Sequence, residues 1–122
     1  MIFLYFIFTI YCFILGGLIT GGIAIAVILY GLLFSGTKLK IEKIQKLWAI
    51  IIFKVIFVRL KVHNIENVDK TKNYIFMANH MSQIDIITLI SLLPLNVKFI
   101  AKKELFKIPF LGYAMKLAGH IL

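Results

Sequence analysis

The chain has 122 residues, of which 14 are Lys or Arg and 5 are Asp or Glu, so its net charge is +9 at neutral pH. Hydrophobic residues make up 61% of it and the mean hydropathy is +0.99, against roughly 45–50% apolar residues in soluble domains. These values exclude a disordered chain and argue against an ordinary soluble monomer. The single cysteine, Cys12, excludes an internal disulfide and a multi-cysteine metal cluster.

The positive charge calls for an anionic partner, either a membrane surface or a nucleic acid. Anionic headgroups attract Lys and Arg next to a membrane segment at about 1 kcal/mol each. No pattern of alternating aromatic and basic residues supports nucleic-acid binding. We therefore expect membrane lipids as the partner and no nucleic acid.

Residues 1–37 contain no charged side chain and predict a membrane-embedded segment. As one helix they would extend about 55 Å, whereas the hydrocarbon core of a bilayer is about 30 Å thick. Either a single tilted helix spans the bilayer, or the helix breaks at Gly16-Gly17 and Gly21-Gly22 and the segment is re-entrant or interfacial. A cleaved signal peptide fits poorly, because no basic residue precedes the apolar stretch.

Residues 38–57 predict a basic amphipathic helix that lies on the bilayer surface, with Trp48 at the interface. The alternative is a helix whose charged face is simply solvated. The basic residues of this region and the segment after it are Lys38, Lys40, Lys43, Lys46, Lys54, Arg59 and Lys61. The positive-inside rule then places everything after Lys38 on the cytoplasmic face of the membrane, the inner membrane if the source is bacterial.

Residues 58–122 alternate between strand and helix patterns. Strands are expected at 58–63, 74–78 and 97–101, the first half-buried by its alternation and the second fully buried. Helices are expected at 84–93, ended by Pro94, and at 104–118, kinked at Pro109 and followed by Gly119 as the C′ residue. This order predicts a partial layered α/β domain that follows the membrane segment.

The segment Asn79-His80-Met81-Ser82-Gln83-Ile84-Asp85 follows an expected strand and opens a helix, where α/β sheets place ligand chemistry. With His80 in the turn and Asp85 in the first helical turn, the carboxylate can orient the imidazole as a general base. No GxSxG elbow supplies a nucleophilic serine, so the hydroxyl that His80 deprotonates would belong to a substrate. Alternatively, Ser82 and Asp85 form a helix capping box and serve structure alone.

This NHxxxxD segment resembles the signature of the glycerolipid acyltransferases. The resemblance covers residues 58–122, and the stretches that follow the signature in bacterial 1-acylglycerol-3-phosphate acyltransferases have counterparts here in Phe99-Ile100-Ala101-Lys102-Lys103-Glu104-Leu105, Ile108-Pro109-Phe110, Gly112 and Gly119. It implies the family's α/β fold. In the family a later EGTR-like block helps to bind the glycerol phosphate, and this chain ends before it. We therefore expect the chain to be the N-terminal half of such an enzyme.

The resemblance also implies an activity and a role for each matched residue. His80 would deprotonate the free hydroxyl of a lysophosphatidate, Asp85 would orient His80, and Asn79 would shape the turn. Lys102 would hold the substrate phosphate, with Lys103 assisting. The acyl donor would be acyl-CoA or acyl-ACP, with no metal and no bound cofactor. The alternative is a non-catalytic, membrane-anchored remnant in which His80 and Asp85 serve only capping and packing.

Overall fold

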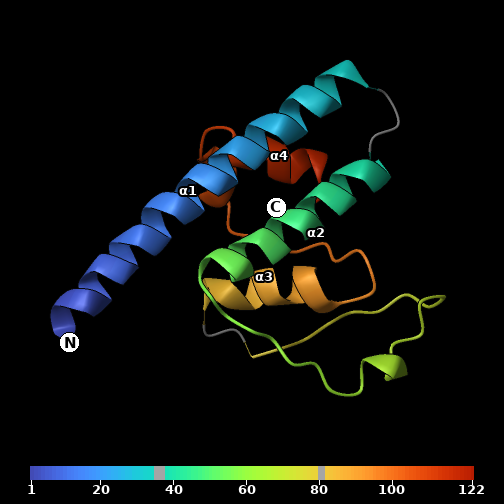
Figure 1. The fold of residues 1–122 in the computed structure, drawn as a ribbon. Coiled ribbons are helices and arrows are strands. Elements are labelled where there is room, and N and C mark those ends of the chain that lie inside the picture. The colour runs from blue at the N-terminus through green and yellow to red at the C-terminus, as the bar shows by residue number, and fades with distance from the viewer. Residues whose placement is uncertain (35–37, 80–81) are drawn as a thin grey trace.

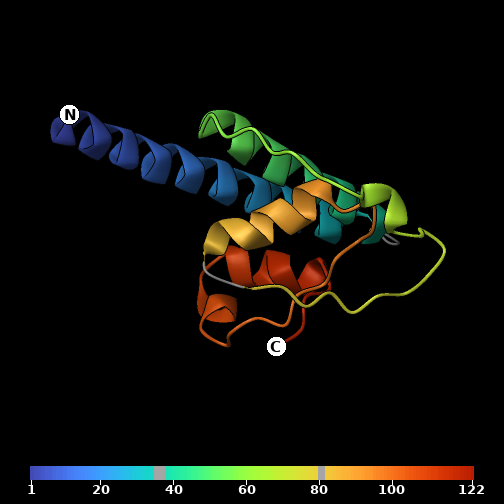
Figure 2. The same ribbon diagram turned by 90° about the horizontal axis from the view of Figure 1, so that it is seen from below.

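The computed structural model describes residues 1–34, 38–79 and 82–122. The elements in these ranges are α1 (Ile2–Leu33), α2 (Lys38–Val55), the 3-10 helix η1 (Ile65–Asn67), α3 (Gln83–Leu92), the 3-10 helix η2 (Leu105–Lys107) and α4 (Leu111–Leu117). Helices α1 and α2 lie side by side and run in opposite directions, while α3 packs against α2 and α4 against α1 (Figures 1 and 2). The helices therefore form two layers.

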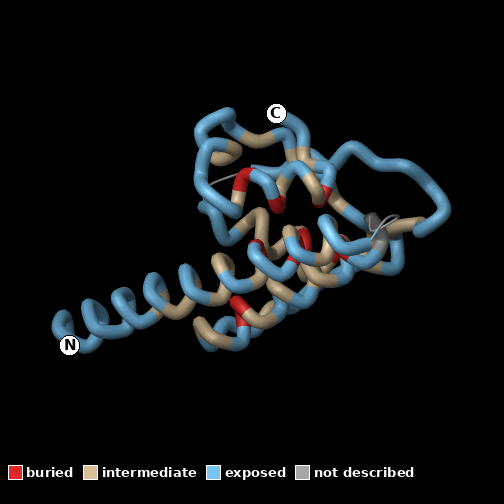
Figure 3. Tube along the Cα trace, turned by 90° about the horizontal axis from the view of Figure 1, so that it is seen from above, coloured by how far each residue is buried: buried red, intermediate tan, exposed pale blue. Residues whose placement is uncertain are grey.

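Helix α1 is continuous through both glycine pairs, so of the two alternatives the single helix is formed and the break at Gly16-Gly17 and Gly21-Gly22 is not. Its 32 residues extend about 48 Å, and it is long and apolar enough to cross a membrane, with a mean hydropathy of 2.5 in its most apolar window. Residues 1–11 are exposed without exception, whereas Ala24 and Val27 are buried against the rest of the chain (Figure 3). Only the C-terminal half of α1 contributes to the protein core.

Helix α2 confirms the helix expected from Lys38 onward, and protein covers part of its apolar surface, whereas Leu47 and Ile50 are exposed. Ile41, Ala49, Ile52 and Phe53 are buried where α2 meets α1 and α3. The indole of Trp48, which the sequence places at the membrane interface, donates a hydrogen bond to Thr20 Oγ1 of α1 at 3.1 Å. The interfacial placement of α2 itself stays a prediction.

Helix α3 begins and ends where its sequence signals predict. Ser82 is the N-cap, and the chain leaves the helix at Leu93, immediately before Pro94, in an extended conformation (ψ 137°). The residue that precedes a proline disfavours the helical region, which explains this end point. Ile90, on the third turn, is buried.

Pro109 divides the helix expected at 104–118 instead of kinking it. The chain forms η2, leaves the helical region at Ile108 (ψ 123°) and starts again as α4 at Leu111. Proline cannot donate the backbone hydrogen bond that a continuous helix requires, and its ring excludes helical geometry at the residue before it. Gly119 adopts φ +81°, as expected for a C′ glycine.

The three expected strands are not formed within the described residues, so the α/β layering is not confirmed. The apolar segment 74–78, expected to be buried, is exposed, and Ile75 and Met77 are about nine-tenths accessible. A strand is stable only when neighbouring strands pair with its backbone. The described residues offer one such contact, an isolated parallel bridge between Ile100 and Ile121.

Candidate active site

The start of α3 holds Ser82 and Asp85 in a capping box. The backbone N–H of Ser82 donates to Asp85 Oδ2 at 2.8 Å, and the N–H of Ile84 donates to Ser82 Oγ at 3.3 Å. The pair thus satisfies backbone donors that the first helical turn leaves without partners. The capping interpretation of this pair is confirmed, and it fixes the Asp85 carboxylate at the beginning of the helix.

Asn79 is exposed just before this turn, and His80 lies outside the described residues. The expected pairing of His80 with Asp85 therefore stays a prediction. Capping does not compete with it, because a carboxylate has about four lone-pair sites for hydrogen bonds.

Lys102 and Lys103 are exposed at the turn that leads into η2, where the N–H of Leu105 donates to the carbonyl of Lys102 at 3.0 Å. Within the described ranges neither ammonium group makes an ion pair. Two solvated cations side by side can attract an anion such as a phosphate. In the same ranges no three His, Cys, Asp or Glu side chains lie close enough together to hold a metal ion.

An apolar cavity of about 280 Å³ runs between the two helical layers. One of its lining residues is Gln83, which belongs to the NHxxxxD segment. The apolar side chains around it come from four helices and from the segment between α3 and η2. They include Ile23, Ala24, Val27, Ile41, Ile86, Ile87, Ile90, Phe99, Leu111, Ala114 and Met115. The start of α3, which carries the end of the signature, and the buried face of α1 therefore line the same cavity.

The cavity also contains a polar pair, Gln45 of α2 and His120. The N–H of Phe99 donates to His120 Nδ1 at 3.1 Å, so the proton of the neutral imidazole is on Nε2. That nitrogen lies 2.6 Å from the side-chain amide of Gln45. The Gln45 atom placed there is Nε2. Two donors would then face each other, so we exchange the amide oxygen and nitrogen of Gln45, which are assigned from such partners, and the oxygen accepts from the imidazole Nε2. A ligand in the cavity thus meets polar groups that are already satisfied.

The pKa of His120 is lowered from 6.5 to about 4 by burial and then by the positive charge of Lys98. A histidine whose pKa is lower in the folded than in the unfolded state stabilises the fold above pH 6.5 and loses that contribution as the pH falls toward 4. We expect the Tm of the wild type in detergent to fall more across this range than the Tm of His120→Asn. Parallel curves for the two proteins would contradict a neutral, buried His120.

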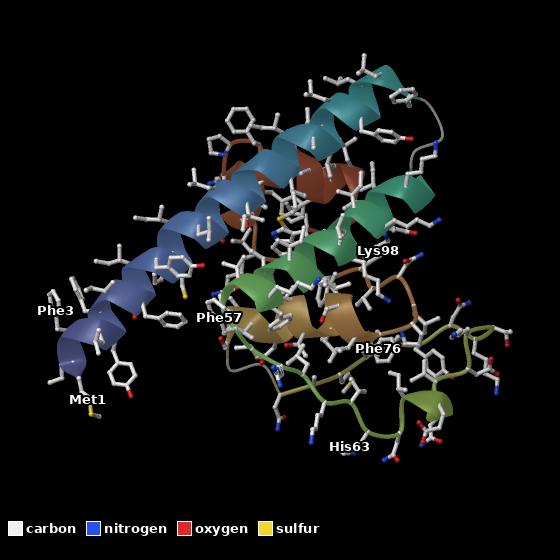
Figure 4. The ribbon with its side chains drawn as sticks, viewed as in Figure 1. Met1, Phe3, Phe57, His63, Phe76 and Lys98 are labelled. Atoms are coloured by element: carbon white, nitrogen blue, oxygen red, sulfur yellow. The ribbon has the colours of Figure 1, made fainter. Side chains whose placement is uncertain are left out.

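Gln45 and His120 are functional candidates that the sequence does not reveal. They are 75 positions apart, and His120 belongs to no recognisable motif. A further link between α2 and a distant segment is the ion pair of Glu42 with Lys98, which lies between α3 and η2, at 2.7 Å (Figure 4 labels Lys98). Such contacts between distant segments become visible only when the helices are packed.

The family model described as Acyltransferase matches residues 59–122, just over half of the chain. The chain belongs to this family. The chloroplastic 1-acyl-sn-glycerol-3-phosphate acyltransferase of Arabidopsis thaliana is 36% identical over 92 residues, which cover 74% of this chain and 25% of that protein. The protein of that name from Saccharomyces cerevisiae is 45% identical over 60 residues, covering 49% of this chain and 20% of the relative.

A third relative, the 1-acyl-sn-glycerol-3-phosphate acyltransferase of Helicobacter pylori, is 48% identical over 48 residues, which cover 39% of this chain and 20% of that protein. This acyltransferase chain spans a quarter or less of the length of these three relatives. None of the solved structures matches it. Membership of the family agrees with the resemblance carried by the NHxxxxD segment.

Proposed function

We propose that this chain carries the catalytic signature of an enzyme that transfers an acyl group to 1-acylglycerol-3-phosphate, giving phosphatidate for phospholipid synthesis. The donor is the thioester acyl-CoA or acyl-ACP. The observation that carries the proposal is the apolar cavity whose wall includes Gln83 of the signature. A cavity with apolar walls and internally paired polar groups suits a hydrocarbon chain.

The proposed reaction is an attack of the lysophosphatidate hydroxyl on the thioester carbonyl. His80 takes the hydroxyl proton while the new C–O bond forms, and the C–S bond then breaks. The proton passes from the imidazolium to the departing thiolate. Asp85 orients His80 and stabilises its charged form, and Asn79 shapes the turn. No metal or bound cofactor takes part.

We assign substrate-phosphate binding to Lys102, with Lys103 assisting. The exposed ammonium groups of both residues suit an anionic ligand that arrives from solvent or from a membrane surface. The remaining contacts to the glycerol phosphate would come from the EGTR-like block of the family.

We also propose that α1 is embedded in the membrane and holds the site at the cytoplasmic face. The exposed N-terminal part of α1, which carries no charged side chain, supports this placement. Met1 and Phe3 lie at the end of α1 that projects furthest from the other helices (Figure 4). Both proposed substrates carry acyl chains, so a site at the bilayer surface shortens the search for them.

Replacing Asp85 by Asn tests the catalytic role of the carboxylate separately from its capping role. The Asn oxygen can still accept the N–H of Ser82, so we expect a small change in Tm. Orientation of His80 and stabilisation of its charged form require the carboxylate, so we expect a large loss of kcat. Turnover is followed by release of CoA from palmitoyl-CoA in the presence of lysophosphatidate, with the full chain in nanodiscs.

Ser82→Ala is the matched control for that experiment. It removes the other half of the capping box and is expected to cost about 0.5–2 kcal/mol of stability, while the Asp85 carboxylate is retained. A kcat that falls equally in both variants would assign Asp85 to structure alone. A folded wild-type chain with no turnover would favour the non-catalytic remnant.

A further inference from the structure

We propose that the hydrogen bond between Gln45 and His120 closes one end of the apolar cavity and thereby limits the length of the acyl chain that the cavity accepts. The inference rests on the proposed function, because it treats the cavity as the acyl-chain site. It adds two residues that set chain-length specificity, one from α2 and one from the segment after α4.

The position of the pair along the cavity follows from α3. Gln83 and Ile90 both line the cavity, and their seven-residue separation on one helix corresponds to about 10 Å. A smaller neighbouring cavity is lined by Ile90 together with Gln45, so Gln45 lies beside the end of α3 that is remote from the signature. Helices α2 and α3 run in opposite directions (Figures 1 and 2), which brings the N-terminal half of α2 to that end.

The pair is suited to stop a hydrocarbon chain because a methylene group cannot replace either hydrogen-bond partner. Pushing the two side chains apart would leave a buried N–H and a buried amide oxygen unsatisfied. Trp48 and Thr20 also line the cavity, but their hydrogen bond joins α2 to α1 within one helical layer. The bond between Gln45 of α2 and His120 after α4 instead crosses from one layer to the other. A chain that enters beside Gln83 therefore meets a polar barrier across its path at Gln45 and His120.

The imidazole is also braced from behind, so it cannot yield easily. Its ring contacts the ring of Phe99, with centroids 5.6 Å apart. The neighbouring Ile121 exchanges backbone hydrogen bonds of 2.9 Å with Phe99 and Ala101. Lys98 Nζ donates to the carbonyl of Ala118 at 2.7 Å and to Glu42 of α2 at 2.7 Å. Hydrogen bonds on either side of His120, at Ala118 and at Ile121, thus tie its segment to residues 98–101.

Photolabelling locates the end of a bound chain without requiring turnover. The full chain in nanodiscs is irradiated with palmitic acid carrying a diazirine at its terminal carbon, and the labelled peptide is mapped by mass spectrometry. We expect labelling of Gln45, Phe99 or His120. A second probe with the diazirine near the carboxyl group is expected to label the start of α3. Terminal labels confined to the start of α3 would overturn the proposal.

Substitution at either partner tests the effect on specificity. In His120→Ala and in Gln45→Ala, we expect the ratio of kcat/KM for stearoyl-CoA over palmitoyl-CoA to rise roughly tenfold, the usual effect of a small change in an apolar pocket. His63→Ala, which removes an exposed histidine outside the cavity, is the matched control and should leave the ratio unchanged. Either variant suffices if the other does not fold.

The two readouts separate this proposal from the proposed function. Turnover with an unchanged chain-length ratio in both folded variants overturns the end stop and leaves the acyl transfer standing. Terminal labelling at His120 without turnover supports the end stop and counts against the reaction. If a folded chain shows no labelling and no turnover, both the end-stop proposal and the proposed acyl transfer are overturned.

Discussion

Replacement of His80 by Ala is expected to lower the turnover of lysophosphatidate by about 10²–10⁴-fold, the usual contribution of a general base. A hydroxyl at neutral pH is a weak nucleophile, and the chain offers no second histidine in the NHxxxxD segment to take its proton. The measurement is the initial rate of CoA release from palmitoyl-CoA at saturating lysophosphatidate. His80→Ala should change kcat far more than KM, because the imidazole acts in the transition state.

The control for this experiment is His63→Ala, which removes a histidine of the exposed segment after α2 (Figure 4). This variant should retain the wild-type rate. Equal rates for His80→Ala and the wild type would remove His80 from the mechanism. In that case the resemblance would extend to the sequence of the family but not to its chemistry.

Gly112→Ala is expected to destabilise the fold by more than the roughly 1–3 kcal/mol that overpacking commonly costs. A Cβ at this position would lie 2.0 Å from the carbonyl oxygen of Phe106 and 2.5 Å from its carbonyl carbon. Both atoms belong to the backbone of η2, so a change of rotamer cannot relieve the overlap. Either η2 or α4 must shift, and α4 also packs against α1. Thermal unfolding in detergent, with the Tm compared to wild type, measures the effect.

Gly22→Ala in α1 is the matched control, because an added Cβ there meets nothing within 4 Å. Alanine favours the helix over glycine by about 1 kcal/mol, so this Tm should be unchanged or higher. A normal Tm for Gly112→Ala would show that η2 is free to move away from α4. Gly112 is also one of the positions through which the chain resembles the acyltransferases.

Several helix boundaries could be predicted because their signals are local, although the helix expected at 104–118 is divided at Pro109. The charge-free run predicts α1, the Ser82-x-x-Asp85 pattern predicts the N-terminus of α3, and Pro94 and Gly119 mark the ends of the two later helices. In each case the chemistry of residues within a short stretch of sequence is the physical cause.

The strands at 58–63, 74–78 and 97–101 were predicted by the same kind of pattern and are not formed within the described residues. Alternation of apolar and polar residues states which face of a strand would be buried, but it does not supply the neighbour that pairs with its backbone. The apolar segment around Ile75 has the composition of a strand and remains exposed. Strand pairing depends on two segments at once, so the pattern of one segment does not predict it.

For the candidate site, the sequence by itself determined the family, the NHxxxxD segment and the charge-free run of residues 1–37, because each consists of contiguous residues. Only the tertiary structure decided that Trp48 turns toward α1, that Gln83 lines an apolar cavity, and that Gln45 meets His120. The reason is that cavities and buried hydrogen bonds arise where helices distant in the chain pack together. Their members share no spacing that a reader of the sequence could recognise.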